Sequence, residues 1–395
     1  MSSFERPPIA HLASLDSWRG ICALLVAVHH FVLFSINEFN YHTIESFFLF
    51  VDFFFVLSGF VISLNYSTRI ATTTDVADFI VRRFARVWPL HALVMAGFVC
   101  VYLTIRVTGT EAPYTIGASG TTYMPLKFPL VLALLNSFGV FSGGWNLPSW
   151  SISAEFFAYL VFASCMLSRY RYALICAFTL LGAYYVFAVS ETHINLTANF
   201  GVFRCLYGFG VGVGAHHLYA HILRRGSLNA VSNTTTEVIA LVALIGFLHT
   251  SVTSSGEAKA ASAFAPLLFS AIIVAYTAQR GAIGRFLRMK PFLKIGQWSY
   301  SIYITHWLVL ISMAAASNAF YPAYRQVELW GGVYWKWDLS SPTAFLTALV
   351  IYLVILLSLS SMTYSAIEDP CRRAASNYLR SRKAAKGAAS TAGQQ

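Results

Sequence analysis

Apolar runs of helical length constrain the fold of this chain more than any other feature. A helix that crosses the hydrocarbon core of a membrane needs roughly 20 mostly apolar residues, and it satisfies its own backbone hydrogen bonds there. With 57% hydrophobic and only 11% charged residues, the composition is far from that of an average soluble domain. The sequence therefore predicts an all-α fold, a polytopic integral membrane helical bundle. We expect about ten transmembrane helices, at residues 15–36, 47–66, 88–107, 148–167, 172–189, 201–220, 236–250, 262–279, 297–316 and 342–366.

One further apolar stretch, at about residues 127–141, is too short to cross a membrane. The crossing that follows it must run inward, because it ends at the basic residues Arg169 and Arg171. The short stretch then begins and ends on the outer side, and its nearby Gly-Gly and Pro allow a broken backbone that protein buries. We expect a re-entrant or interfacial segment there.

Basic clusters between the apolar runs set the expected topology. Arg82, Arg83 and Arg86 form the densest cluster of the first half, and HILRRGS, QRGAIGRFLRMKPFLK and the C-terminal tail carry others. Loops rich in Lys and Arg stay in the cytoplasm, and ten spans place every cluster on that side. We expect a multi-pass protein of the bacterial inner membrane with both termini cytoplasmic, the Arg82 to Arg86 segment as a cytoplasmic loop, and residues 109–125 and 317–341 outside.

This arrangement divides the chain into three regions. Residues 1–14 form a cytoplasmic lead, residues 15–366 the membrane domain, and residues 367–395 a basic cytoplasmic tail that we expect to be partly disordered because its end is small and polar. The topology signals explain the net charge of +11, so membrane lipid is an expected partner and nucleic acid is not. The six cysteines lie scattered without metal-ligand spacing, and we expect no disulfide framework and no metal site.

Ionisable residues inside the expected spans mark a candidate site. The first span carries Arg19 and His30, whose separation of eleven residues is close to three helical turns, or roughly 16 Å of rise on one face. His29 points elsewhere, about a quarter turn away. Asp52 lies among the aromatic residues of the second span. Ionisable groups at membrane depth usually face a protein interior or a cavity and suggest a functional site, although a lone histidine can simply be part of the packing.

Five local sequences, in one order, resemble the successive motifs of the membrane acyltransferase 3 family. They are LDSWRGICALLVAVHH, FFLFVDFFFVLSGFVI, RRFARVWPLH, WNLPSWSISAEFFAYL and IGQWSYSIYITHWLVL, and they cover residues 15 to about 310. The resemblance implies a ten-helix membrane enzyme that moves an acyl group, commonly acetyl, from cytoplasmic acyl-coenzyme A (acyl-CoA) to a hydroxyl. The acceptor in such enzymes is usually an extracytoplasmic or membrane-associated carbohydrate or glycolipid.

The arginines are the candidate coenzyme-binding residues. The family's cytoplasmic Arg-x-x-Arg motif falls on Arg83 and Arg86, and its Arg-x10-His pair begins at Arg19. Guanidinium groups form strong, often bidentate hydrogen bonds with phosphate, so Arg82, Arg83 and Arg86 can hold the nucleotide of acetyl-CoA or another acyl-CoA. Arg19 is expected to position its arm. Setting topology and binding lipid headgroups is the other explanation of this cluster.

The Arg-x10-His pair ends at His30, which is the candidate general base because imidazole titrates near neutral pH. A carboxylate on its other ring nitrogen would fix the tautomer. Both Asp52 and Glu155 are expected in the outer half of the membrane with His30, and we prefer Glu155, the acidic residue that follows the family's Trp-Ser motif. Direct transfer and an acyl-histidine intermediate both remain open. His306, in the ninth span, is as compatible with core packing as with a role in the site.

Two other functions fit the same residues. In a proton-coupled secondary transporter, Arg19, His30, Asp52 and Glu155 would form an ion relay, although we see no internal repeat of the kind that many transporters contain. A non-enzymatic partner of polysaccharide assembly is the second alternative. The sequence names neither the acceptor nor the acyl chain length, and a homo-oligomer is compatible with it.

Overall fold

The computed structural model of the chain describes residues 12–37, 42–108, 126–140, 145–228, 233–253, 257–277, 280–320, 324–329 and 332–392. The α-helices are α1 Ala13–Phe34, α2 His42–Glu45, α3 Phe50–Tyr66, α4 Thr73–Thr108, α5 Lys127–Leu132, α6 Trp150–Met166, α7 Arg171–Tyr184, α8 Gly201–Arg224, α10 Thr234–Thr250, α11 Ala265–Tyr276, α12 Ala282–Leu287, α13 Lys290–Gln297, α14 Ser299–Phe320, α15 Pro342–Thr363 and α16 Asp369–Ala392. The other elements are the single-turn helices η1 Ser46–Leu49, η2 Leu147–Ser149, η3 Tyr185–Val189, η4 Ala260–Phe264 and η5 Tyr364–Glu368, and the strands β1 Ser35–Ile36, β2 Tyr324–Leu329 and β3 Gly332–Asp338.

The helical membrane bundle that the sequence predicts is confirmed. A helix lies in each of the ten expected spans, and in the described part of the chain seven helical segments are long and apolar enough to cross a membrane. Of the remaining three, α8 has 24 residues, and α10 and α11 are shorter, with 17 and 12. The short stretch after residue 126 is also confirmed as non-spanning, because α5 contains only six residues.

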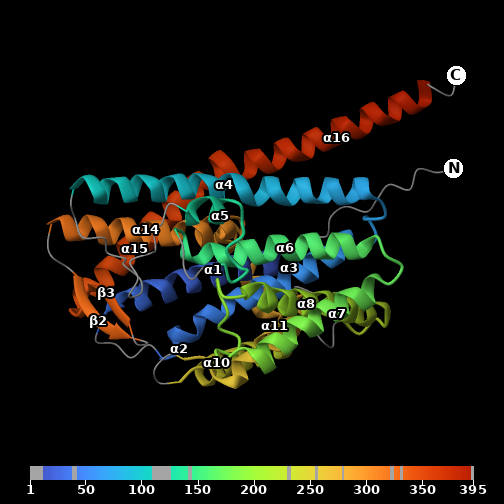
Figure 1. Cartoon of the computed structure of the whole chain (residues 1–395). Coiled ribbons are helices and arrows are strands. Elements are labelled where there is room, and N and C mark those ends of the chain that lie inside the picture. The colour runs from blue at the N-terminus through green and yellow to red at the C-terminus, as the bar shows by residue number, and fades with distance from the viewer. Residues whose placement is uncertain are drawn as a thin grey trace.

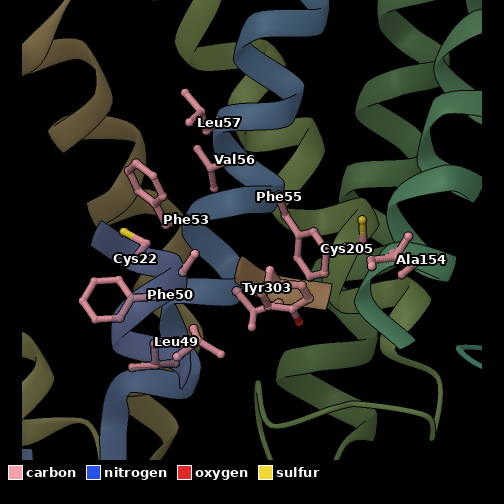
Figure 2. Packing of buried hydrophobic residues seen from close by; sticks show 14 of the residues in the cluster. Cys22, Leu49, Phe50, Phe53, Phe55, Val56, Leu57, Ala154, Cys205 and Tyr303 are labelled. Atoms are coloured by element: carbon pink, nitrogen blue, oxygen red, sulfur yellow. The ribbon is translucent and has the colours of Figure 1, made fainter. Parts of the chain in front are cut away.

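Helix α3 lies at the centre of the bundle. Its residues are mostly apolar, and almost every residue from Phe50 to Phe60 is buried. Figure 2 shows its side chains surrounded by Cys22 of α1, Ala154 of α6, Cys205 of α8 and Tyr303 of α14. The five helices therefore share one apolar core.

Helix α4 corrects one expectation. The arginine cluster was expected in a loop before a span at 88–107, but α4 is continuous over 36 residues and contains Arg82, Arg83 and Arg86. Pro89 lies inside this helix, where proline lacks the N–H that would bond to the preceding turn. The ring nitrogens of the neighbouring Trp88 and His91 bond to carbonyls of α5, at 3.1 and 3.0 Å. The cluster is thus held on a rigid element.

The bundle has a small sheet at one end and a basic helix at the other (Figure 1). Strand β3 pairs in parallel with β1 and antiparallel with β2, where the sequence analysis expected only a loop over residues 317–341. The tail was expected to be partly disordered, but α16 continues to Ala392. Ion pairs from Arg382 and Lys383 to the buried Asp78 attach α16 to α4. The expected external loop at 109–125 lies outside the described residues.

Candidate active site

A cavity of about 500 Å³ opens inside the bundle where α1, α3, α4, α6 and α14 meet. Its lining combines apolar side chains of α3 with charged groups from several other helices. The charged residues of the lining are Asp16, Arg19, Arg83, Arg86, Glu155, Glu368 and Arg372. Cations and carboxylates at this depth are costly unless they are paired or used, so this cavity is the strongest candidate site in the described residues.

Three of the four arginines that line the cavity differ in their hydrogen bonds. Arg19 lies 3.6 Å from Asp16, one turn earlier on α1. Arg83 donates to the Tyr66 hydroxyl at 3.1 Å, while its Nε has no partner. Arg86 forms no hydrogen bond or ion pair with any residue that the structure describes. Its guanidinium is therefore available for an anion in the cavity.

Glu155 also lines this cavity, because α6 begins at Trp150 and presents the face of Ser151, Glu155 and Tyr159 to the interior. The Tyr159 hydroxyl donates to Glu155 at 2.6 Å and lies 3.0 Å from the Ser58 hydroxyl. The Arg83 guanidinium stands over the Tyr159 ring, 5.8 Å from its centre. Glu155 is therefore part of the arginine cavity, whereas the sequence analysis placed it in the outer half with His30.

Arg82 faces away from the cavity. Its guanidinium donates to the hydroxyl of Ser376 on α16, at 3.1 Å, and it does not contribute to the lining. Successive residues on a helix point in directions about 100° apart, so Arg82 and Arg83 cannot both face one cavity. Spacing along the chain places the three arginines in one cluster and does not distinguish them by direction.

Asp52 is held by an arginine that is not among the predicted site residues. Arg204 of α8 donates to both carboxylate oxygens, at 2.9 and 2.7 Å, and to the Phe48 carbonyl at 3.1 Å. Asp52 is fully buried and Arg204 is 1% exposed. The pair is bidentate, so this carboxylate is not on His30. Arg204 could have been identified from the sequence, because it is an arginine inside an expected span and an intramembrane charge needs a partner.

His30 has a different neighbour from the expected carboxylate. Its Nδ1 lies 3.1 Å from the Val26 carbonyl and 3.1 Å from Nε2 of His306 on α14, and the two rings stack with centres 5.0 Å apart. No carboxylate among the described residues bonds to the His30 ring, so the expected support by Asp52 or Glu155 is absent from this structure. His29 instead bonds to the Ile44 carbonyl at 3.0 Å.

The histidine pair adjoins the cavity without lining it. Tyr303 lines the cavity and lies one helical turn before His306 on α14. Its hydroxyl lies 2.7 Å from the Ser151 hydroxyl, and its ring centre lies 5.7 Å from that of His306. The charged cavity and the histidine pair therefore follow one another along α1 and α14. On α1, Arg19 lies at the cavity and His30 lies in the histidine pair.

Comparisons with known proteins show the family of the chain. The sequence profile of a family described as an acyltransferase domain matches residues 12–363 of the chain. The chain belongs to this acyltransferase family. It is an integral membrane acyltransferase, and the resemblance of its five motifs is confirmed.

The chain is also similar to two named proteins. The chain is 25% identical to acyltransferase MdmB of Streptomyces mycarofaciens, over 93% of each chain. It is 30% identical to protein 2 in the picA locus of Rhizobium radiobacter over 166 residues, which are 40% of this chain and 84% of that protein. No solved structure matches the chain.

Proposed function

We propose that this acyltransferase moves an acyl group, most simply acetyl, from cytoplasmic acyl-CoA to a hydroxyl of an extracytoplasmic or membrane-associated carbohydrate. The observation that carries the proposal is the state of Arg86, a cation that forms no hydrogen bond or ion pair with a described residue and lies in a cavity that Arg19 and Arg83 also line. The carboxylate of Glu368 acts on it electrostatically, but its N–H groups are left to donate to an anionic ligand, and a cation at membrane depth marks a functional site.

The coenzyme suits this cavity in charge and shape. Its phosphates accept charge-assisted hydrogen bonds from guanidinium groups, and Arg86 and the free Nε of Arg83 can donate them. Its pantetheine arm is long and thin, and the apolar side of α3, with Phe54 and Leu57, lines the same space. We propose that the arm passes Arg19 and carries the thioester toward Tyr303 and the histidine pair beyond it.

Transfer to a hydroxyl then follows from the position of His30. The His30 imidazole accepts the hydroxyl proton as the acceptor oxygen bonds to the thioester carbon. The carbon–sulfur bond breaks, and the coenzyme thiolate leaves with the proton that the imidazolium returns. Each molecule of acyl-CoA and acceptor thus yields one ester and one free coenzyme thiol. An acyl-histidine intermediate would divide the same exchange into two steps.

The experiment uses two neighbouring arginines of α4. The purified protein in lipid nanodiscs is given radiolabelled acetyl-CoA and a carbohydrate extract, and labelled ester is measured. Arg86→Ala should raise the KM for acetyl-CoA about 10- to 100-fold, because a hydrogen bond to a charged group is worth roughly 1.5–3 kcal/mol. Arg82→Ala is the matched control, since Arg82 points to Ser376 outside the cavity, and it should leave this KM within about twofold.

Three results contradict the proposal. Equal effects of Arg86→Ala and Arg82→Ala would show that the cluster acts through its general charge. Binding of acetyl-CoA without formation of ester would exclude transfer from this donor to the extract. Movement of a labelled sugar across a sealed vesicle without any modification would support the transporter instead.

A further inference from the structure

His30 and His306 form a hydrogen-bonded pair between α1 and α14. The His306 Nε2 and His30 Nδ1 atoms are 3.1 Å apart, and His306 is fully buried. The Tyr352 hydroxyl, from α15, lies 3.3 Å from the His306 carbonyl and 3.4 Å from the Ala27 carbonyl. Three helices therefore hold the two rings in a fixed relation.

Backbone carbonyls determine where the protons of both rings lie. The His306 Nδ1 is 2.5 Å from the Tyr303 carbonyl, and a carbonyl can only accept, so this nitrogen carries hydrogen. The His30 Nδ1 is 3.1 Å from the Val26 carbonyl, so it carries hydrogen for the same reason. In a neutral His306 the remaining nitrogen, Nε2, is an acceptor, and the N–H that it faces is that of His30.

His306 is neutral in this arrangement. Its side chain is fully buried, and no carboxylate among the described residues bonds to it. An unpaired cation in such surroundings is strongly disfavoured. The other titratable rings near the pair are His29, with its ring centre 5.2 Å from that of His30, Tyr303, with its ring centre 5.7 Å from that of His306, and Tyr352 of α15. None of the three supplies a negative charge at neutral pH.

We infer that His306 is a positioning residue for acyl transfer: its Nε2 shares the His30 Nδ1–H with the Val26 carbonyl, and the two acceptors together fix the His30 tautomer and leave the lone pair on His30 Nε2. The inference rests on the proposed function, in which His30 is the base. It gives to a second histidine the part that a carboxylate plays in hydrolytic triads. When His30 Nε2 takes the hydroxyl proton, the new positive charge is shared through Nδ1–H with His306 Nε2, and no proton moves between the rings.

Two isosteric amides test the inference at position 306. A glutamine side chain can place an acceptor oxygen where His306 Nε2 lies, whereas an asparagine reaches only the place of Nδ1. His306→Gln should therefore retain at least about a tenth of kcat, and His306→Asn should lose on the order of 100-fold or more, the scale of general-base catalysis. The KM for acetyl-CoA should stay within about twofold in both, because His306 does not line the cavity. A packing role predicts similar losses for the two amides.

A spectroscopic measurement tests the tautomer without any acyl transfer. The protein is labelled with ¹⁵N-histidine, and the His30 signals are assigned by their loss in His30→Gln. In the wild type at neutral pH, Nδ1 should give the signal of a protonated nitrogen and Nε2 that of an unprotonated one. His306→Gln should preserve this pattern. His306→Asn leaves the Val26 carbonyl as the remaining acceptor of the His30 Nδ1–H, so it should raise the population of the tautomer protonated on Nε2.

The outcomes separate this inference from the function on which it rests. A wild-type His30 that carries its proton on Nε2 overturns the inference, whatever the activity and whether or not the variants fold. Equal kcat for the two folded amide variants overturns it as well. A wild type with the expected tautomer but no transfer from acetyl-CoA would instead contradict the proposed function.

Discussion

At the scale of single residues, the two adjacent histidines on α1 differ in burial and in hydrogen-bond partners. His29 is 8% exposed and its Nδ1 is tied to the Ile44 carbonyl, whereas His30 is half-buried beside His306. Removal of a general base typically costs about 100- to 10,000-fold in rate. We predict that His30→Ala lowers acyl transfer by this amount in protein that remains folded, and that His29→Ala loses far less. The rate of acyl transfer by each purified variant tests this prediction. A His29→Ala variant that is the more damaged of the two would show that the base is misassigned.

The Asp52–Arg204 pair makes a separate prediction about stability. Both groups are buried and joined by two hydrogen bonds, so removing one leaves the other charged without a partner. Such a break typically costs about 3–5 kcal/mol, while replacing both partners by apolar residues is often neutral. Asp52→Leu and Arg204→Leu should each lower the melting temperature in nanodiscs, and the double variant should recover most of the loss. Purely additive losses would mean that the two groups are not coupled.

These residues show which parts of the site can be predicted from the sequence. The ionisable positions in the spans were identifiable because charge is rare there, and two of them, Arg19 and Glu155, line one cavity together with Arg83 and Arg86 of the basic cluster. Their partners were not identifiable, because partnership depends on which helices become neighbours and on the direction of each side chain. Asp52 bonds to a residue 152 positions away, and His30 to one 276 positions away. No local pattern encodes either distance.

At the scale of elements, α3 and α8 pack unusually closely through glycines. A Cβ added to Gly212 would lie 1.9 Å from the Val56 carbonyl oxygen, whereas one added to Gly214, on the same helix, would have nothing within 4 Å. Small residues let membrane helices approach in this way. We predict that Gly212→Ala lowers the melting temperature sharply, because backbone must move. Gly214→Ala should leave it unchanged or raise it slightly, since alanine is the better helix former. Equal melting temperatures would argue against the tight α3–α8 contact.

Element boundaries were less predictable than element positions. All ten expected spans contain helices, because apolar length alone requires them. The continuation of α4 through Arg82, Arg83 and Arg86 was missed, since a cluster of charges is usually the end of a span. It persists because α16 supplies partners to this part of α4, with Ser376 bonded to Arg82. The pairing of β2 with β3 was missed because residues 317–341 were assigned to an external loop from their position between two spans.

At the scale of the whole molecule, the basic helix and the small sheet lie at opposite ends (Figure 1). Helix α16 carries many of the arginines and lysines of the chain, and such residues gather on the cytoplasmic side. The cavity with Arg83, Arg86 and Arg372 adjoins the helices at this end, while α1 leads from Arg19 past His30 to β1. We propose that the donor enters from the α16 end and that the acceptor approaches from the sheet end.

The final prediction follows from this orientation and compares two exposed serines. Ser227 follows the basic end of α8, and Ser341 lies between β3 and α15. In a background without the six native cysteines, Ser341→Cys should react with a membrane-impermeant maleimide in intact cells. Ser227→Cys should react only after the cells are opened, because its loop carries Arg224 and Arg225 and is held inside. The reverse pattern would place the arginine cavity on the outer side, away from cytoplasmic acyl-CoA, and labelling of both positions in intact cells would contradict a membrane between them. Either result would remove the physical basis for a cytoplasmic donor, because guanidinium groups can collect the coenzyme only from the compartment that their cavity faces.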